Sequence, residues 1–541
     1  MTTRPIAMIL LGSLFWSLPA AADRRSKRRV AQEAEVEEKE DSDGPEANAV
    51  LPIKLDDLIE VAVRLAPELA RSKNDRFAAK GEAKAARRDQ QWVVTTEGKY
   101  SRFAFSPDVE VGAFGTVAED TLSASLGIGR NIPTGGNIGF QIGIQRTIKE
   151  LEIPAVFNDQ IASMAPAGAD QGDFISDTIP LVQSSAKLIF KQPLVRGFGK
   201  DVALAQQTKA DFAATEATVK TQLAAEEMLR DVVSAYWELA YAAEEVDTRA
   251  EALKIAKDQE QKTRIEIRAK TAPDSALTAV LYEVQIREEA LLTAQNEWEK
   301  KSLELRKRAG LELERRDLVM RPVDAFEAAD DEWDAEDVLA RARKSNRRMA
   351  ALILAKRGAD IDVKVAKNAM LPKVDLELSG ALIGSGNNTD AALSAATNSN
   401  GYEVTAGITV QFDIGGAAKG SLDAARARKQ RLEVDLADTA RTLDTDVIHA
   451  VHQVKSARAR VAFADRAIQY AVQNLNAEVS AYQSKLRTNF DVMQRQTELV
   501  NARLRRGRAI ADYHLAVANV QFLGGFLLEQ YRVNVRPVAK R

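Results

Sequence analysis

The chain has 541 residues, and its 75 basic and 78 acidic side chains give a formal net charge of −3, so no basic excess indicates a nucleic acid partner. The absence of cysteine excludes disulfides, thiolate nucleophiles and cysteine-bound metal or iron–sulfur centres. With 3 histidines, neither histidine-based catalysis nor a histidine-rich metal site is a favoured prediction.

The amino terminus has the three parts of a secretory signal peptide. Arg4 supplies a positive charge, residues 6–18 are apolar, and an Ala-x-Ala pattern ends the segment at Ala22. We therefore predict a signal peptide over residues 1–22 and export of the rest, rather than an uncleaved anchor helix, for which the apolar stretch is short. Beyond it no apolar run reaches the roughly 18 residues of a membrane-spanning helix, whereas the short strands of a membrane barrel remain possible.

The next segment, residues 23–50, carries a basic cluster, then an acidic cluster, and almost no large apolar side chains. Such a segment cannot bury enough apolar surface to offset the entropy lost on ordering. We predict a disordered, charged leader that is solvated, in preference to one bound to anionic lipid or peptidoglycan.

The remaining chain follows one plan twice. Each half opens with a helical segment, at Leu55 and at Glu336, continues into alternating strands, and then enters a very long helical stretch. Internal duplication of this kind defines an architecture. The predicted divisions are a first repeat over residues 51–323, an acidic linker over 324–335, a second repeat over 336–530 and a carboxyl-terminal tail over 531–541.

The strands are predicted from alternation of apolar residues with polar or small ones. In residues 402–412 every even position from Tyr402 to Phe412 is apolar, and every odd position is polar or glycine. A soluble sandwich has the same pattern, but export and the polar second faces favour strands that cross a bilayer, which need about 9–11 residues. Strands are predicted over residues 93–105, 184–192, 373–383 and 402–413, with an extra hairpin over about 120–148.

Two stretches, residues 201–272 and 421–506, contain neither glycine nor proline. They predict long helices over about 200–310 and 420–523, whereas globular helices average about 11–12 residues. Helices of roughly 100 Å far exceed the ~30 Å hydrocarbon core, so they must project from the membrane, into the periplasm of an exported protein. Four strands cannot close a barrel, because the smallest have about eight, and the unpaired edges therefore imply an oligomer.

This two-repeat plan resembles the TolC family of outer-membrane efflux and secretion channels over nearly all of residues 51–530. The resemblance rests on the opening helix with its Ala-Pro step at residues 66–67, on the strand-to-helix junctions, and on two helix-hairpin tips. It implies a fold of long, duplicated α-hairpins that form a periplasmic α-barrel, with about four strands per protomer in a shared trimeric β-barrel of about twelve strands.

The resemblance also implies a gate at the periplasmic ends of the hairpins. The residues that match the family's aperture are Asp274, Tyr482, Arg487 and Asp491. Arg487 and Tyr482 would donate hydrogen bonds to Asp274 in the closed state, and the trimer's copies of Asp491 would form one acidic ring that attracts cations. The tip residues that match the family's adaptor contacts are Arg268, Ala272, Pro273, Lys485, Thr488 and Asn489.

The function implied by the resemblance is a passive exit duct of a tripartite efflux pump or a type I secretion system. Its location is the outer membrane, in contact with lipid, with the helices in the periplasm. The implied partners are two further copies of the chain, a periplasmic adaptor protein, and an inner-membrane transporter of the resistance-nodulation-division or ABC type.

The place of the extra hairpin stays open at this point. It surrounds an Asn-Ile-Pro-Thr-Gly-Gly-Asn turn at residues 131–137, and it can enter the barrel, sit above the membrane, or fold against the barrel. We favour an extracellular or peripheral hairpin, although a short turn flanked by longer loops also suits insertion, which would raise a trimer's barrel to about eighteen strands.

Two other classes of function fit the sequence less well. An enzyme is not predicted, and neither is a cofactor or metal: residues 196–200 resemble a phosphate loop only faintly, because Leu194 stands where its first glycine belongs, and His449 and His452 are ordinary helix residues. The alternative function is a structural periplasmic coiled-coil envelope protein without a pore. It explains the helices but not the amphipathic strands.

Overall fold

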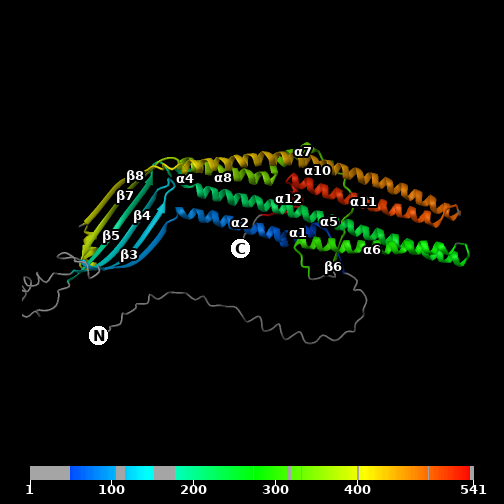
Figure 1. Ribbon diagram of the computed structural model, residues 1–541, viewed down its shortest axis with the longest axis horizontal. Coiled ribbons are helices and arrows are strands. Elements are labelled where there is room, and N and C mark those ends of the chain that lie inside the picture. Colours follow the sequence, from blue (N-terminus) through cyan, green and yellow to red (C-terminus); the bar gives the residue numbers. More distant parts are fainter. Residues whose placement is uncertain are drawn as a thin grey trace, which may run out of the picture. The chain divides into compact units, whose positions relative to one another are not determined.

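The computed structural model describes residues 49–104, 116–151, 177–271, 273–313, 318–330, 332–398, 401–484 and 486–535 (Figure 1). The predicted signal peptide and residues 23–48 of the predicted leader lie outside these ranges and stay predictions. Residues 49 and 50, assigned to the leader from sequence, instead begin a strand of the compact unit that starts at Ala49. Across the described ranges, no helix combines the length and the apolar character that a membrane span requires.

Each half of the chain contributes two helices before its strands and a long helical hairpin after them (Figure 1). The first hairpin packs α5 (Ala205–Arg268) against α6 (Asp274–Ala309), and the second packs α10 (Ala417–Gln483) against α11 (Asn489–Leu523). α5 has 64 residues and α10 has 67, so each is roughly 100 Å long. The helices before the strands are α1 (Leu55–Leu65), α2 (Pro67–Ala86), α7 (Ala335–Ser345) and α8 (Arg347–Ala369).

Local sequence explains where several of these helices begin and end. Pro67 occupies the first turn of α2, where its missing N–H is not needed. At the corresponding break in the second half, Asn346 caps α8 by accepting a hydrogen bond from the Met349 N–H at 3.1 Å. Gly310 ends α6 with a φ of 73°, and a Cβ there would lie 2.4 Å from the carbonyl oxygen of Leu65.

Six strands form one antiparallel sheet in the order β2-β3-β4-β5-β7-β8. Four of them, β2, β5, β7 and β8, correspond to the four strands predicted from alternation, and β3 and β4 are the extra hairpin. The strands are β2 (Val93–Ala104), β3 (Thr116–Asn131), β4 (Asn137–Leu151), β5 (Asp177–Pro193), β7 (Lys373–Gly386) and β8 (Gly401–Gln411).

The position of the β3–β4 hairpin corrects two expectations, namely a peripheral hairpin and about four strands per protomer. β3 pairs with β2 and β4 pairs with β5 along their lengths, so the hairpin separates β2 from β5 inside the sheet. The physical reason is that the alternation of the hairpin continues that of its neighbours. Pairing inside the sheet satisfies the backbone groups on both of its sides and aligns its apolar residues with theirs.

The register gives this sheet an apolar face and a polar face. Ile128, for example, lies opposite Val94 in β2 and opposite Phe140 in β4, and directly opposed residues point to the same side. The exposed members of the apolar face include Val94, Tyr100, Leu122, Leu126, Ile128, Phe140, Ile142, Ile144, Leu188, Leu378, Leu382, Tyr402, Val404, Ile408 and Val410. Members of the polar face include Glu97, Lys99, Ser123, Ser125, Gln141, Gln145, Lys187, Lys191, Glu377, Glu403 and Thr405.

Sequence patterns did not predict the small parallel sheet of β1 (Ala49–Ile53) and β6 (Leu318–Pro322), from which the linker continues. The carboxylate of Asp324, at the start of this linker, accepts hydrogen bonds from the Leu55 N–H at 2.8 Å and from the hydroxyl of Tyr236. Tyr236 is 0% exposed in the main core of α1, α5 and α11, and burial together with the bond to Asp324 raises its pKa well above the usual value. Asp324 therefore connects the start of the first repeat to the centre of α5.

The same linker contacts α11 through a histidine. The ring of His514 stacks on Trp237 with centroids 3.6 Å apart and an interplanar angle of 4°, and its Nε2 lies 2.9 Å from the carbonyl oxygen of Glu327. Burial lowers the pKa of His514 to about 4, against an opposing effect of the Glu327 carbonyl. The folded chain therefore favours the neutral imidazole.

His514 should make the chain less stable in acid. Its folded pKa of about 4 lies below the unfolded value of about 6.5, so the unfolded chain binds more protons between these pH values. The stabilisation is complete above about pH 6.5 and is lost as the pH falls towards 4, by at most about 3 kcal/mol. We expect His514→Phe, which retains ring stacking, to reduce the change of the unfolding midpoint with pH over this window. The exposed control His449→Gln should leave that change as in wild type.

The pH dependence of stability in His514→Phe must be subtracted from that of wild type, because a second buried group, Glu226, makes the folded chain more stable in acid. Burial raises the pKa of Glu226 to about 7 although Arg347 lies 3.2 Å away, so its stabilising contribution is lost as the pH rises from about 4.5. If the unfolding midpoint changes equally with pH between about 4 and 6.5 in wild type and in His514→Phe, the assignment to His514 is wrong.

Candidate periplasmic gate

The tips of the two helical hairpins lie together at the end of the helices opposite the sheet (Figure 1). The first tip joins α5 to α6 through Lys270, a residue with a left-handed φ of 56°, and through Pro273, the N-cap of α6. The second tip joins α10 to α11 at Thr488, whose side chain caps α11. Neither turn contains a glycine at its centre, and the second turn is ended by Thr488, whose side chain caps the start of α11.

Near the tips, side chains of Tyr482 and Asn489 in the second hairpin bind the first hairpin. The hydroxyl of Tyr482, near the end of α10, donates to the carboxylate of Glu266 in α5, with oxygen separations of 3.0 and 3.2 Å. Burial, and then the bond to Glu266, raises the pKa of Tyr482 to about 12, so the phenol remains a donor at neutral pH. The amide of Asn489 donates to Thr263 Oγ1 at 3.3 Å, and Thr263 is 1% exposed. We call these two contacts the hairpin link.

Asp491 has a local structural role. Its carboxylate accepts hydrogen bonds from the backbone N–H of Thr488 at 2.9 Å and from the Thr488 hydroxyl at 2.8 Å, which completes a capping box. The backbone bond and then the hydroxyl lower the pKa of Asp491, with a smaller effect from Arg487 and Arg495. The carboxylate is therefore ionised and held at the first turn of α11.

Within the described chain, Tyr482 and Arg487 have partners other than Asp274, and the role of these residues as a gate stays a prediction. Asp274 is an exposed residue in the first turn of α6, and its side chain forms no hydrogen bond or ion pair with another described residue. Glu266 accepts from Tyr482, while the guanidinium of Arg487 lies 3.3 Å from a carboxylate oxygen of Glu478 on its own α10. The reason is geometric, because Glu266 stands in the last turn of α5 within reach of the Tyr482 hydroxyl, whereas Asp274 follows the turn.

The remaining tip residues are mostly at the surface. Arg268 ends α5 and, like Pro273 and Thr488, is exposed, whereas Asn489 is half-buried in the hairpin link. Ala272 and Lys485 lie outside the described residues. Sequence reasoning missed two apolar residues at the second tip, Leu486 with 79% exposure and Phe490 with 64%. The feature of the sequence that could have identified them is an apolar side chain in an otherwise polar turn.

The other candidate site from the sequence, the faint phosphate loop, is a structural turn. Residues 196–200 form the turn from β5 to α4 (Lys200–Ala203), as expected, and the N–H groups of Gly197 and Gly199 are taken by Asn368 Oδ1 at 2.7 Å and by the Thr134 carbonyl at 3.1 Å. Across the described ranges, no group of three or more histidines and carboxylates is arranged to hold a metal ion.

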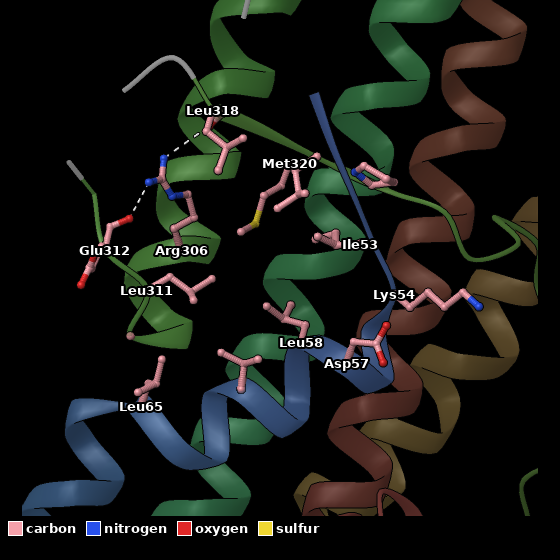
Figure 2. Close-up of a pocket in the computed structure, with 14 residues that line it drawn as sticks. Ile53, Lys54, Asp57, Leu58, Leu65, Arg306, Leu311, Glu312, Leu318 and Met320 are labelled. Atoms are coloured by element: carbon pink, nitrogen blue, oxygen red, sulfur yellow. Dashed lines mark hydrogen bonds between the residues drawn. The ribbon is translucent and has the colours of Figure 1, made fainter. Parts of the chain in front are cut away.

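A cavity of about 660 Å³ lies between α1, the end of α6 and the β1–β6 sheet, away from the hairpin tips (Figure 2). Its wall is largely apolar, with Leu58 and Met320 among the lining residues. Arg306, 2% exposed, directs its guanidinium to the backbone carbonyl oxygens of Leu318 and Glu312. Arg306 thus holds the loop after α6, and the cavity belongs to the packing of the repeat junction.

Comparisons with known proteins agree with this arrangement. Residues 338–525 match the family model described as outer membrane efflux protein. No match was found among curated proteins.

Solved structures of outer-membrane channels are similar over most of the chain. VceC from Vibrio cholerae has 16% identity and a TM-score of 0.62, with 87% of this chain and 96% of VceC covered. CmeC from Campylobacter jejuni has 12% identity and a TM-score of 0.63, covering 87% and 85%. The open state of MtrE from Neisseria gonorrhoeae has 13% identity and a TM-score of 0.59, covering 88% and 89%. The resemblance to the TolC family is thereby confirmed: residues 338–525 match the outer membrane efflux protein model, and the chain as a whole has the fold of these channels.

Proposed function

We propose that the chain is the exit duct of a tripartite efflux pump or a type I secretion system. In this proposal a trimer forms a passive channel through the outer membrane, and an adaptor and an inner-membrane transporter open its periplasmic end. The single observation that carries the proposal is the sheet, whose exposed apolar face and two open edges continue into helices of roughly 100 Å.

The sheet has the features of one sector of a membrane barrel. A monomeric soluble protein rarely exposes so continuous an apolar face, whereas lipid would cover it. On the other side, ion pairs between neighbouring strands, such as Lys191 with Glu377 and Lys149 with Glu119, suit a water-filled lumen. A structural spacer without a pore gives no reason for this two-sided sheet.

The hairpin tips supply the gate in this proposal. The hairpin link holds both hairpins of one copy together, which favours a narrow periplasmic end, and a trimer places its copies of Asp491 around one axis. The exposed Leu486 and Phe490 offer apolar contacts for a periplasmic adaptor, and docking there would act within a few residues of Tyr482 and Asn489.

The test is a pair of measurements on the full-length protein. Outer-membrane fractionation with heat-modifiable gel migration reports a barrel, and planar-bilayer recording reports a channel. The duct requires both, with cation-selective openings. Folded, detergent-stable protein that stays in the periplasmic fraction and forms no channels would contradict the duct and favour the structural spacer.

Asp491→Asn should reduce the cation selectivity of these openings and weaken block by divalent cations. The reason is that the change removes one charge per copy from the proposed ring, while asparagine still serves as an acceptor for the start of α11. Asp423→Asn, at the opposite end of α10, is the matched control. Reversal potentials in a salt gradient measure the effect, and an unchanged permeability ratio in Asp491→Asn would disprove the ring.

A further inference from the structure

The β3–β4 hairpin is integrated into the sheet on both sides. Its pairing with β2 runs from Val93↔Gly129 to Ala104↔Ala118, and its pairing with β5 runs from Asn137↔Lys191 to Leu151↔Asp177. At ~4.8 Å between neighbours, the two intervening strands hold β2 and β5 roughly 14 Å apart. No register in the described sheet brings β2 against β5.

The hairpin also supplies the middle of the apolar face. Leu122, Leu126, Phe140 and Ile142 are 59%, 45%, 45% and 43% exposed, and they continue the row that includes Leu188. Towards the end of the sheet away from the long helices, this face changes character, with an ion pair of Arg102 and Asp120 at 3.6 Å and a bond from Tyr100 to Asp120 at 2.9 Å. There the short helix α9 (Thr389–Thr397) packs on β5 and β7, and the Ser184 hydroxyl donates to the Ala392 carbonyl oxygen at 2.8 Å. An apolar band bounded by a tyrosine and charges is typical of a lipid-facing barrel wall.

The turn of the hairpin is fitted to the helical end of the sheet. The Thr134 hydroxyl donates to Gln192 Oε1 at 2.8 Å, and the Thr134 carbonyl accepts from the Gly199 N–H at 3.1 Å. Gly135 has a φ of 95°, and a Cβ there would lie 2.2 Å from the carbonyl oxygen of Gly197. Short turns on the periplasmic side are the rule in membrane barrels, so this contact fixes the hairpin as a wall element.

The two outer strands, β2 and β8, are exposed along nearly all of their length and have no second partner in the described chain. Six strands are fewer than the about eight of the smallest membrane barrels, so the sheet does not close on itself. A β8 edge that pairs with the β2 edge of another copy makes a head-to-tail contact, which closes into a ring.

We propose that each copy contributes six strands to the barrel, with β2 and β8 as the contacts between copies, so that a trimer builds a wall of about eighteen strands. This inference rests on the proposed function for the number of copies. Because barrel diameter grows roughly linearly with strand number, the pore is ~1.5-fold wider than one of about twelve strands. The wide exit leaves the hairpin tips as the constriction that governs passage.

Engineered disulfides test the strand order, because the chain has no cysteine of its own. In outer membranes treated with oxidant, cysteines at Lys99 and Ser123, which are opposed across β2 and β3, should form a disulfide, as should cysteines at Gln141 and Lys187 across β4 and β5. Cysteines at Lys99 and Lys187 should not, since two strands separate them. Between copies, cysteines at Thr95 and Thr409, or at Lys99 and Thr405, should give covalent dimers and trimers.

A matched pair of arginine variants tests the lipid contact. Leu126→Arg on the apolar face should abolish the heat-modifiable assembly, whereas Ser125→Arg on the polar face should retain it. Equal tolerance of both changes would overturn the inference.

Channel recording on the same proteins separates this inference from the proposed function. Suppose that the protein forms channels, that cysteines placed at Lys99 and Lys187 form a disulfide, and that cysteines placed at Lys99 and Ser123 do not. This result would overturn the six-strand wall and leave the duct intact. Folded protein that forms no channels would overturn the proposed duct, and the inference of a wider pore would fall with it.

Discussion

Tyr482→Phe combined with Glu266→Gln should convert a mostly closed channel into a mostly open one. The double change removes the phenol-to-carboxylate bond of the hairpin link. A partly exposed hydrogen bond of this kind contributes about 1 kcal/mol, so the proposed trimer would lose about 3 kcal/mol of its preference for the closed state. This loss raises the ratio of open to closed channels roughly a hundredfold. Single-channel recording should show a large rise in open probability and larger mean conductance.

Two controls make this prediction specific. Tyr470→Phe changes a tyrosine of the same helix that is 63% exposed, and it should leave the channel unchanged. Asp274→Asn should also have little effect, because the side chain of Asp274 contacts no other described residue through a hydrogen bond or ion pair. A channel that opens in Asp274→Asn and stays closed in the double variant would reject the hairpin link as the gate.

Asp324→Ala should destabilise the folded chain by about 2–4 kcal/mol, because it leaves the Leu55 N–H and the buried Tyr236 hydroxyl without their carboxylate acceptor. The Tyr236 hydroxyl retains the Ile53 carbonyl oxygen at 3.2 Å, which limits the loss. Denaturant unfolding in detergent measures the effect as a lower midpoint at unchanged slope.

The same linker offers a matched control for this change. The side chain of Asp330 is 88% exposed and pairs with Arg458, so Asp330→Ala should cost less than about 1 kcal/mol. Asp324→Asn, which keeps one acceptor oxygen, should recover part of the loss. Equal unfolding midpoints for Asp324→Ala and Asp330→Ala would show that the buried carboxylate is not a structural connection.

Local patterns in the sequence predicted the elements better than their partners. Alternation identified the strands, and the stretches without glycine or proline identified α5 and α10, because both signals arise within one element. The place of the β3–β4 hairpin was missed, since alternation defines a face but not the neighbouring strand. The decisive contacts, such as Val93 with Gly129, join residues that are far apart along the chain.

The proposed gate shows the same limit at the level of single residues. The resemblance to the TolC family identified Tyr482, but the acceptor of its hydroxyl depends on how the two hairpins pack, and several carboxylates lie close to the tips. The acid chosen from sequence, Asp274, stands beyond Pro273, whereas the actual acceptor, Glu266, stands in the last turn of α5. Pairing between two long helices is a tertiary property that neither sequence segment contains alone.

Electron cryomicroscopy of the purified full-length protein in lipid nanodiscs tests the central claim most directly. The account predicts a threefold assembly with a continuous lumen, six strands per copy in the membrane, and a narrowing where Tyr482 meets Glu266. A solid helical bundle, or a single copy whose β2 and β8 edges and whole apolar face are covered by its own chain, would contradict it.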